Sequence, residues 1–383
     1  MAFGSRLTNM ELSFSRAAAL RALQAATPLL GARYEANRNT DRGPDAPPTT
    51  SILSPFLRRR LLLETEAVAA AYAAHGAAAE KFVQEVFWRG YFKGYLETRP
   101  WIWTDYLEAV GRNRGGLEGS AGLRRAYDAA VEGRTGIEGF DDWARELVAR
   151  GWLHNHARMW FASIWIFTLR LPWALGADFF LRHLIDGDPA SNTLSWRWVA
   201  GLHTRGKHYV ARAENIRRFT DGRFSPSGLN EAPQALEEPD GPGPVRLPAP
   251  SAPPGCEVAL LLHGDDLCPE TLDLGGARVA RICPVPAHVP GAAPAVMRAD
   301  EAALADAVAR AQAHFGCGAG EVPPGVGLIA AWAPVGPSAD ALRPCTRLRR
   351  PWDEAIWPRS KAGFFKVRAA IPEIWEGLVT AEA

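Results

Sequence analysis

The chain has 383 residues, 47% of them hydrophobic, which is enough for two domains with a sizeable core. Its 43 Lys and Arg nearly balance 42 Asp and Glu, so overall charge excludes a strongly basic protein, and attraction to nucleic acid requires a local patch. Five cysteines without a CxxC pair argue against a zinc site or a disulfide framework, and we expect a cytoplasmic protein with no bound metal.

The first elements are a helix and a loop. Residues 13–33 are rich in Ala, Leu and Arg at helical spacing, which predicts an amphipathic helix ending near Gly31. Residues 34–48 are polar and contain Pro, Gly, Asn and Asp, which is typical of a loop. Farther along, the longest apolar run, Met159–Leu169, is shorter than the ~18 residues that span a bilayer, so we expect no membrane segment.

Hydroxyl side chains gather at Thr49, Thr50 and Ser51, just before Ser54-Pro55. Ser followed by Pro predicts the N-cap and first position of a helix that continues through FLRRRLLLETEAVAAAYAA. A helix N-terminus presents free N–H groups and the positive end of its dipole, so this segment is a candidate pyrophosphate site. Most Ser-Pro helix starts nevertheless bind no ligand.

Residues 80–99 predict a helix that carries Phe82, Glu85, Trp88 and Arg89 at steps of three and four. An ordinary core helix with Glu85 on its flank is one interpretation. Glu85 lies among apolar side chains, however, and an unpaired carboxylate there would be costly to bury. The pattern therefore also favours a polar site on this helix.

The stretch from Gly151 to Trp198 carries the densest set of polar side chains. GWLHNHARMWFAS predicts a helix with several side chains on one face: Trp152, Asn155, Arg158, Met159 and Ala162. DFFLRHLI predicts another helix, which stops at Asp186-Gly187-Asp188-Pro189. Asp188 followed by Pro189 predicts an N-cap, and the next helix carries Asn192 and Trp196 inward. We expect Asn155, Arg158, Asp186, Asp188 and Asn192 to meet where these helices converge.

A basic run follows Trp198. The segment from Arg197 to Arg223 contains seven cations and only two acidic residues, Glu214 and Asp221, and aromatic side chains are interleaved among them. The usual meaning of such a run is a solvated surface, and the alternative is a contact with a phosphate backbone. Residues 225–255 are dense in Pro, Gly and Ser, which predicts a semi-rigid linker and a domain boundary.

The last third predicts a small α/β domain with a parallel sheet. Val258–Gly264, Ala277–Val285 and Val326–Val335 have the pattern of buried strands, and Asp300–Phe315 that of a helix with Asp300 near its cap. No GxGxxG or P-loop follows these strands. The cluster of His263, Asp265, Asp266 and Cys268 suggests metal ligands, but polar residues are normal in a loop after a parallel strand.

Two motifs, GWLHNHARM and LIDGDPASNTLSWRW, resemble the signature of the DNA photolyase and cryptochrome family. TTSILSP is similar to the phosphate-binding segment of that family, and EVFWR to its ExxWR segment. The resemblance extends from about Tyr34 to Phe224. It implies an all-α FAD-binding domain at 1–225. The composition and pattern of the remaining residues predict the linker at 226–255 and a small Rossmann-like α/β domain at 256–383. The family's α/β antenna domain usually precedes the FAD domain, so the order here is atypical.

The resemblance also implies a flavin site. The residues matched to FAD contacts are Tyr34, Thr50, Ser51, Leu53, Ser54, Phe82, Arg89, Asn155, Arg158, Asp186, Asp188 and Asn192. Arg158 and Asp186 are expected to form a buried ion pair beside the ring, and each would destabilise the fold without the other. By resemblance, Asn192 faces the flavin N5. Ile52 stands where the family usually carries a basic residue.

By the same resemblance, a pyrimidine dimer flips out of DNA and is split by an electron from the excited reduced flavin. Glu85, Trp88, Asn155, Met159 and Trp198 match the pocket for the dimer, with the two Trp stacking on bases. Another departure is His156, which stands where repair enzymes tend to have arginine.

Trp196 and Trp173 match the inner members of the family's electron-relay chain. No aromatic residue stands near Ser120–Ala121, where the third member would fall. Residues that would substitute for it are Trp165, Trp160 and Tyr127.

Three functions remain open. The first is FAD-dependent, blue-light-driven repair of pyrimidine dimers in damaged DNA, with the run from Arg197 to Arg223 contacting phosphates. The second is a cryptochrome-like photoreceptor without repair activity, which His156 and the incomplete relay favour. The third is a flavin-holding relative without a light-dependent role.

Overall fold

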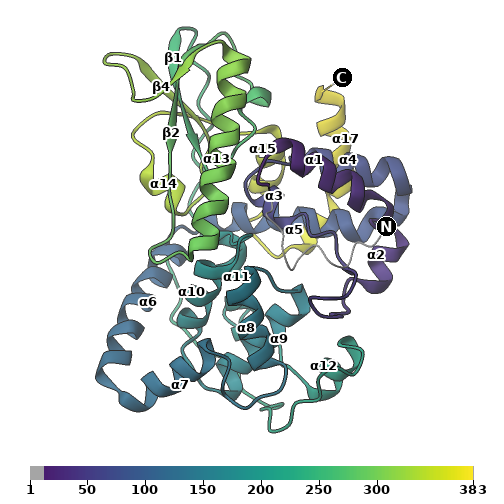
Figure 1. The fold of residues 1–383 in the computed structure, drawn as a ribbon. Helices are drawn as coiled ribbons and strands as arrows, with labels where there is room; N and C mark the ends of the chain where they lie inside the picture. Colours follow the sequence, from purple (N-terminus) through teal and green to yellow (C-terminus); the bar gives the residue numbers. More distant parts are fainter. Residues whose placement is uncertain (1–12, 383) are drawn as a thin grey trace.

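The computed structural model describes residues 13–382, in which a helical part lies beside a five-stranded sheet (Figure 1). The first helices carry the predicted phosphate segment and the helix with Glu85. They are α1 (Arg16–Ala26), η1 (Thr27–Leu29), α2 (Ala32–Asn37), α3 (Ser54–Arg58), α4 (Glu64–His75), η2 (Gly76–Ala79) and α5 (Glu80–Glu97).

The remaining helices of the helical part build the other side of the predicted site. They are α6 (Trp101–Gly119), α7 (Ala121–Val131), α8 (Phe140–Arg150), α9 (Asn155–Ser163), the π-helical turn η3 (Ile164–Thr168), α10 (Trp173–His183), α11 (Pro189–Ala200) and α12 (Ala213–Phe219). Asp188 is the N-cap of α11 and accepts a hydrogen bond from the Ser191 amide, which confirms the predicted cap.

The helix predicted from Ser54 onward is wrong in its extent and in its cap. The N-cap of α3 is Leu53, Ser54 is its first residue, and the helix ends after five residues. Two residues have a left-handed backbone: Ile52 before the helix, with φ 51°, and Arg60 after it, with φ 50°. The next helix, α4, starts only at Glu64. The break turns the arginine side chains of this segment toward the sheet.

The sheet is entirely parallel, with strand order β3-β2-β1-β4-β5, and this confirms the predicted α/β region. The strands are β1 (Glu257–His263), β2 (Arg278–Val285), β3 (Gly318–Ala319), β4 (Gly327–Ala331) and β5 (Thr346–Leu348). The helices of this region are η4 (Pro269–Thr271), α13 (Pro294–Phe315), α14 (Pro337–Ala341), α15 (Pro351–Ile356), η5 (Trp357–Arg359), α16 (Phe365–Ala369) and α17 (Ile371–Glu382).

The long helix α13 covers one side of the sheet and begins six residues before the predicted Asp300. Pro294 occupies its first position, where the fixed φ of proline suits a helix. Asp300 therefore lies inside the helix, and its carboxylate pairs with Arg59 at 2.6 Å instead of capping. The predicted cap at Asp300 is wrong.

The two parts share a core. One buried cluster combines Leu62 and Phe87 of the helical part with Leu260 of the sheet and Ile356 of α15. At the contact between α5 and η5, a Cβ on Gly94 would lie 2.7 Å from the Cα of Trp357, so only glycine permits this approach. The domain boundaries at 225 and 256 remain predictions, and the packing across them is close.

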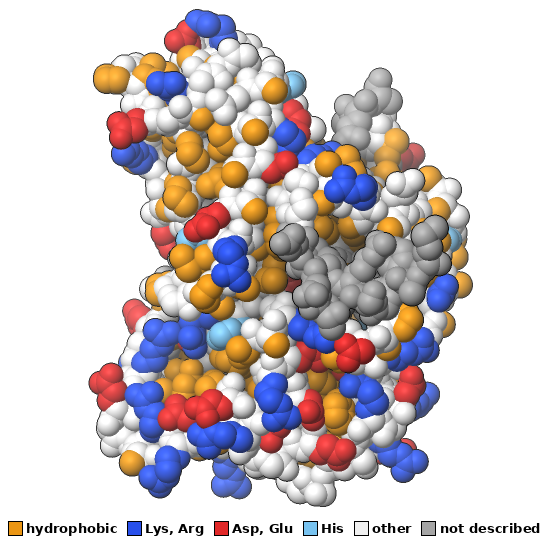
Figure 2. Space-filling model, viewed as in Figure 1, with side chains coloured by type: hydrophobic (Ala, Val, Ile, Leu, Met, Phe, Trp, Pro, Cys, Tyr) orange, Lys and Arg blue, Asp and Glu red, His pale blue; other side chains and the backbone are white. Residues whose placement is uncertain are grey.

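On the face shown in Figure 2, basic and acidic side chains are interspersed over the helical part. This mixing agrees with the near-zero net charge of the chain. Within residues 13–382, no helix combines the length and the apolar character that crossing a membrane would need.

Candidate functional site

The centre of the site is an ion pair between α9 and the turn after α10. Arg158 donates from Nη2 to both carboxylate oxygens of Asp186, at 3.0 and 2.9 Å, and Ser54 Oγ donates to Oδ2 at 2.6 Å. Asp186 is buried, which by itself would raise its pKa. Arg158 and the Ser54 hydroxyl outweigh that effect, and the pKa of Asp186 lies below its usual value. The predicted ion pair is therefore confirmed.

A second carboxylate, Asp188, faces two cations from α5. Its Oδ2 lies 3.8 Å from Lys93 Nζ and 4.0 Å from Arg89 Nη1. Burial would raise the pKa of Asp188, but Lys93 and Arg89 lower it to about 2, so the group is a carboxylate at neutral pH. Both cationic nitrogens are buried without a hydrogen-bond partner among the described residues.

Unpartnered donors show that the residues present fit a flavin nucleotide. The hydroxyl of Thr50 and Nη1 of Arg89 are buried and donate to no described group, an arrangement that normally requires a bound acceptor. Phosphate oxygens are such acceptors. Asn155 is exposed and Met159 half-buried beside the ion pair, which leaves these side chains accessible to a ring.

The other predicted FAD contacts lie on α2, α5 and α11 and in the segment before α3. Asn192 on α11 is buried, and its Nδ2 donates to the carbonyl of Ala177 at 2.8 Å, which fixes the amide. Tyr34 on α2 packs edge-on against Phe82 of α5, with ring centroids 5.6 Å apart. Leu53 is buried and Ser51 half-buried in the segment that leads into α3.

The five predicted pocket residues come from three helices, and α11 packs against both α5 and α9. Glu85 on α5 is 38% exposed and accepts from Arg38 Nη1 at 2.7 Å. Burial raises the pKa of Glu85, and Arg38 acts in the opposite direction. On α9, Asn155 Nδ2 makes only a long contact of 3.8 Å with the sulfur of Met159, so its amide is available to a ligand.

The two pocket tryptophans are each stacked on a side chain that the sequence analysis missed. Trp88 lies against Phe364 from the C-terminal region, with centroids 3.8 Å apart and planes at 16°. Trp198 stacks on Tyr209 at 5.7 Å. No local sequence signal points to Phe364. Arg38 was also missed, although it follows Tyr34 by one helical turn and so faces the same way.

The predicted electron-relay residues have different neighbours. Trp196 contacts Trp165 edge-on at 6.3 Å, and Tyr127 contacts Trp165 at 5.9 Å. Trp173 stacks instead on Tyr106 at 5.8 Å, a residue the sequence analysis missed. A further predicted substitute, Trp160, stacks on Trp143 and His156.

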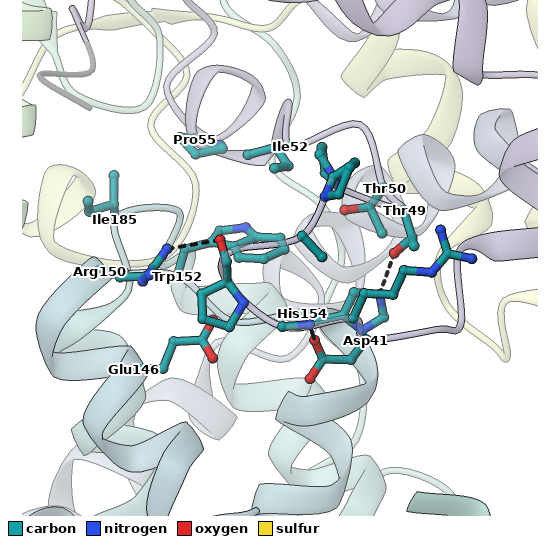
Figure 3. A pocket seen from close by; sticks show the side chains of 16 residues that line it. Asp41, Thr49, Thr50, Ile52, Pro55, Glu146, Arg150, Trp152, His154 and Ile185 are labelled. Carbon is teal, nitrogen blue, oxygen red and sulfur yellow. Dashed lines mark hydrogen bonds between the residues drawn. The ribbon is translucent and has the colours of Figure 1, made fainter. Parts of the chain in front are cut away.

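The pocket in Figure 3 borders the predicted phosphate segment and is partly open to solvent, with about 690 Å³ of empty space including the open part. Thr50 and Trp152 line it together with two carboxylates. Burial and the nearby Asp41 raise the pKa of Glu146 there to about 7. His156, outside this pocket, contacts the Asn39 carbonyl, and burial lowers its pKa, so it is neutral at pH 7.

Three of the seven basic side chains after Trp196 are already paired. Arg197 contacts Glu238, Arg205 contacts Asp240, and Arg223 contacts Asp41. The four cations without an ion pair to a described residue are Lys207, Arg212, Arg217 and Arg218, all exposed. The basic surface is therefore smaller than the sequence suggests.

The carboxylates after β1 bind arginines. Asp265 accepts from Arg58 at 2.6 Å, and Asp266 accepts from Arg350 at 2.6 Å. Arg60, 1% exposed, reaches Asp353 at 2.6 Å. Within residues 13–382, no three His, Cys, Asp or Glu side chains are grouped to hold a metal.

Comparisons with known proteins show which proteins this chain resembles in sequence. Residues 82–226 match the family described as the FAD binding domain of DNA photolyase. The chain is 35% identical over 181 residues to the deoxyribodipyrimidine photo-lyase of Streptomyces griseus, covering 44% of this chain and 38% of the relative. It is 36% identical over 152 residues to that of Thermus thermophilus, covering 40% and 35%.

Among solved structures, a class III photolyase from Agrobacterium tumefaciens is 27% identical, with a TM-score of 0.43. That match covers 54% of this chain and 44% of the other. The chain thus spans little more than a third of the length of the curated relatives it matches. Over residues 82–226 it is similar to the FAD binding domain of DNA photolyase.

Proposed function

We propose that this chain repairs pyrimidine dimers in DNA in a light-driven reaction. The observation that carries the proposal is the buried junction of Arg158, Asp186 and Ser54, beside donors that lack an acceptor. Bound FAD supplies light absorption and one-electron chemistry. Thr50 and Arg89 hold its phosphates, and the ion pair and Asn192 meet the polar edge of its ring.

Recognition of the dimer falls to the pocket residues. Trp88 and Trp198 offer aromatic faces on which bases stack, at about 1–3 kcal/mol per base. Glu85 and Asn155 offer hydrogen bonds to the exposed edges of the dimer. A damaged, poorly stacked site costs only a few kcal/mol to extrude from the duplex, and this contributes to selectivity.

Illumination of the purified protein with a dimer-containing oligonucleotide tests the proposal. We expect blue light to restore intact thymines in the presence of a reductant, and no restoration in the dark. Trp88→Ala should weaken binding of the dimer, while Leu107→Ala, which changes an exposed side chain on α6, serves as the matched control. Binding without any restored thymine would rule out repair.

A second candidate, a flavin photoreceptor without repair activity, is favoured by two contacts. Phe364 covers one face of Trp88, and the carboxylate of Glu85 already forms an ion pair with Arg38. Neutral His156 also binds phosphate less firmly than arginine would. This candidate predicts a light-induced change in proteolytic cleavage or partner binding with no repair, and a protein whose cleavage pattern is the same in light and dark would exclude it.

A further inference from the structure

The segment 357–368, with the sequence WPRSKAGFFKVR, combines cations and aromatic side chains outside the region that matches the family. It holds four basic residues and no acidic one. Its two adjacent phenylalanines differ sharply, because Phe364 is 4% exposed and Phe365 is 76% exposed. Among the large hydrophobic side chains of the described residues, Phe365 is the most exposed, which indicates a contact surface.

Contacts with α5 and its C-terminal end fix this segment beside Trp88. Phe364 stacks on Trp88 at 3.8 Å and contacts Tyr91 at 5.6 Å. Arg99 Nη2 donates to the Lys361 carbonyl at 2.8 Å. Consecutive Cα atoms are about 3.8 Å apart, so the exposed Phe365 follows directly on the residue that stacks on Trp88.

A row of aromatic rings connects this segment with the basic loop after α11. Trp88 contacts Phe92 at 5.2 Å, and Phe92 contacts His203 at 6.0 Å. Lys207 is exposed in the same loop as His203 and has no ion pair with a described residue. In the segment that carries Phe364, Lys361 and Lys366 are exposed. Exposed cations therefore occur in both chain segments that contact these aromatic rings.

We propose that Phe365, Lys361 and Lys366 form a DNA-contacting element of the C-terminal region, which we call the FF segment. Phe365 stacks on a base beside the extruded dimer, and the two lysines neutralise backbone phosphates. An exposed aromatic ring between cations suits a partner with flat rings and phosphate charges, whereas an apolar protein surface would not need the cations. The inference rests on the proposed function, since it takes the same DNA as its partner.

Binding of an oligonucleotide that carries 2-aminopurine beside a pyrimidine dimer tests the FF segment. We expect Phe365→Ala to raise the Kd about 5- to 100-fold, from the usual range for one stacked base, and to relieve the quenching of 2-aminopurine. Phe365→Trp, which keeps an aromatic ring, should retain the wild-type Kd and the quenching of 2-aminopurine. Leu107→Ala, which removes another exposed apolar side chain, should leave the Kd unchanged.

The lysines are tested by salt dependence. Lys361→Gln together with Lys366→Gln should lower the slope of log K against log salt by about 0.9 per lost phosphate contact on duplex DNA. Equal Kd and equal quenching for the wild type and Phe365→Ala would overturn the inference. Tighter binding of undamaged single-stranded RNA than of DNA would also overturn it.

The outcomes separate this inference from the proposed function. If the wild type repairs dimers and Phe365→Ala binds and repairs equally well, the FF segment is refuted and repair stands. If binding depends on Phe365 but light restores no thymine, repair is refuted and the FF segment stands. A wild-type protein that binds no DNA refutes both.

Discussion

Glu97 at the end of α5 offers a direct test of how the two parts of the molecule are joined. The residue is 7% exposed, and its carboxyl group accepts from the Val335 amide at 2.7 Å and from the Trp332 indole at 3.2 Å, with no ion pair to any residue that the structure describes. Burial raises its pKa from 4.5 to about 7, although the two hydrogen bonds act in the opposite direction. The folded state therefore holds a proton that the unfolded chain has lost.

The sign follows from proton linkage. Between pH 4.5 and 7 the unfolded chain releases the proton while the folded protein retains it, so stability falls as the pH rises, by about 3 kcal/mol in total. Glu97→Gln cannot ionise. Its single oxygen accepts only one of the two hydrogen bonds, because Val335 and Trp332 donate to different oxygens of Glu97, and the loss of the other bond lowers stability equally at every pH. We therefore expect the variant to gain about 3 kcal/mol relative to the wild type between pH 4.5 and 8.

Urea unfolding followed by tryptophan fluorescence, at several pH values, measures this difference. Glu108→Gln is the matched control, because the Glu108 side chain is 62% exposed and its replacement should leave the pH dependence unchanged. A stability difference between Glu97→Gln and the wild type that stays constant from pH 4.5 to 8 would refute the argument.

Three further substitutions test the site and its surroundings. Asp186→Asn leaves a guanidinium without its partner, and we expect loss of most bound flavin and about 3 kcal/mol of stability, measured by absorbance and urea unfolding; unchanged flavin content would contradict this. Asp266→Ala leaves buried Arg350 without its carboxylate partner and removes one of the three partners of Arg60, which should cost about 3–5 kcal/mol, whereas Asp273→Ala in an exposed turn should not; equal urea midpoints would count against it. Arg217→Gln with Arg218→Gln should lower the salt slope of DNA binding by about 0.9 per lost contact, and an unchanged slope would remove α12 from the DNA surface.

Periodicity predicted the main elements of the fold well. α5, β1 and β2 lie within two residues of their predicted bounds, because each buries apolar side chains at regular spacing. α11 starts where the Asp188-Pro189 cap predicts, whereas α10 begins five residues before the predicted run at Asp178. Strands β3 and β5 were missed, since two or three residues carry no pattern. The break after α3 was also missed, because the left-handed backbone of Arg60 depends on partners that are distant in sequence.

In the candidate site, too, some contacts could be predicted from the sequence and others could not. Arg158 and Asp186 could be paired in advance because they belong to the two motifs that resemble the family signature, 28 residues apart. Phe364 and Trp88 are 276 residues apart, and nothing near either residue indicates their stacking. The hydroxyl of Ser54 was assigned to a cap, but the charged oxygen of Asp186 is the stronger acceptor and orients it instead.

The three consecutive arginines after α3 restrict how the protein can be dissected. Arg58, Arg59 and Arg60 come from the helical part, yet their carboxylate partners Asp265, Asp300 and Asp353 belong to the sheet region. A gene shortened at the linker would produce a polypeptide in which Arg58 and Arg59 lack their carboxylate partners, Arg60 keeps only Glu64, and an apolar surface is uncovered and prone to aggregate. Roles of the C-terminal region are therefore better separated by single substitutions than by deletion.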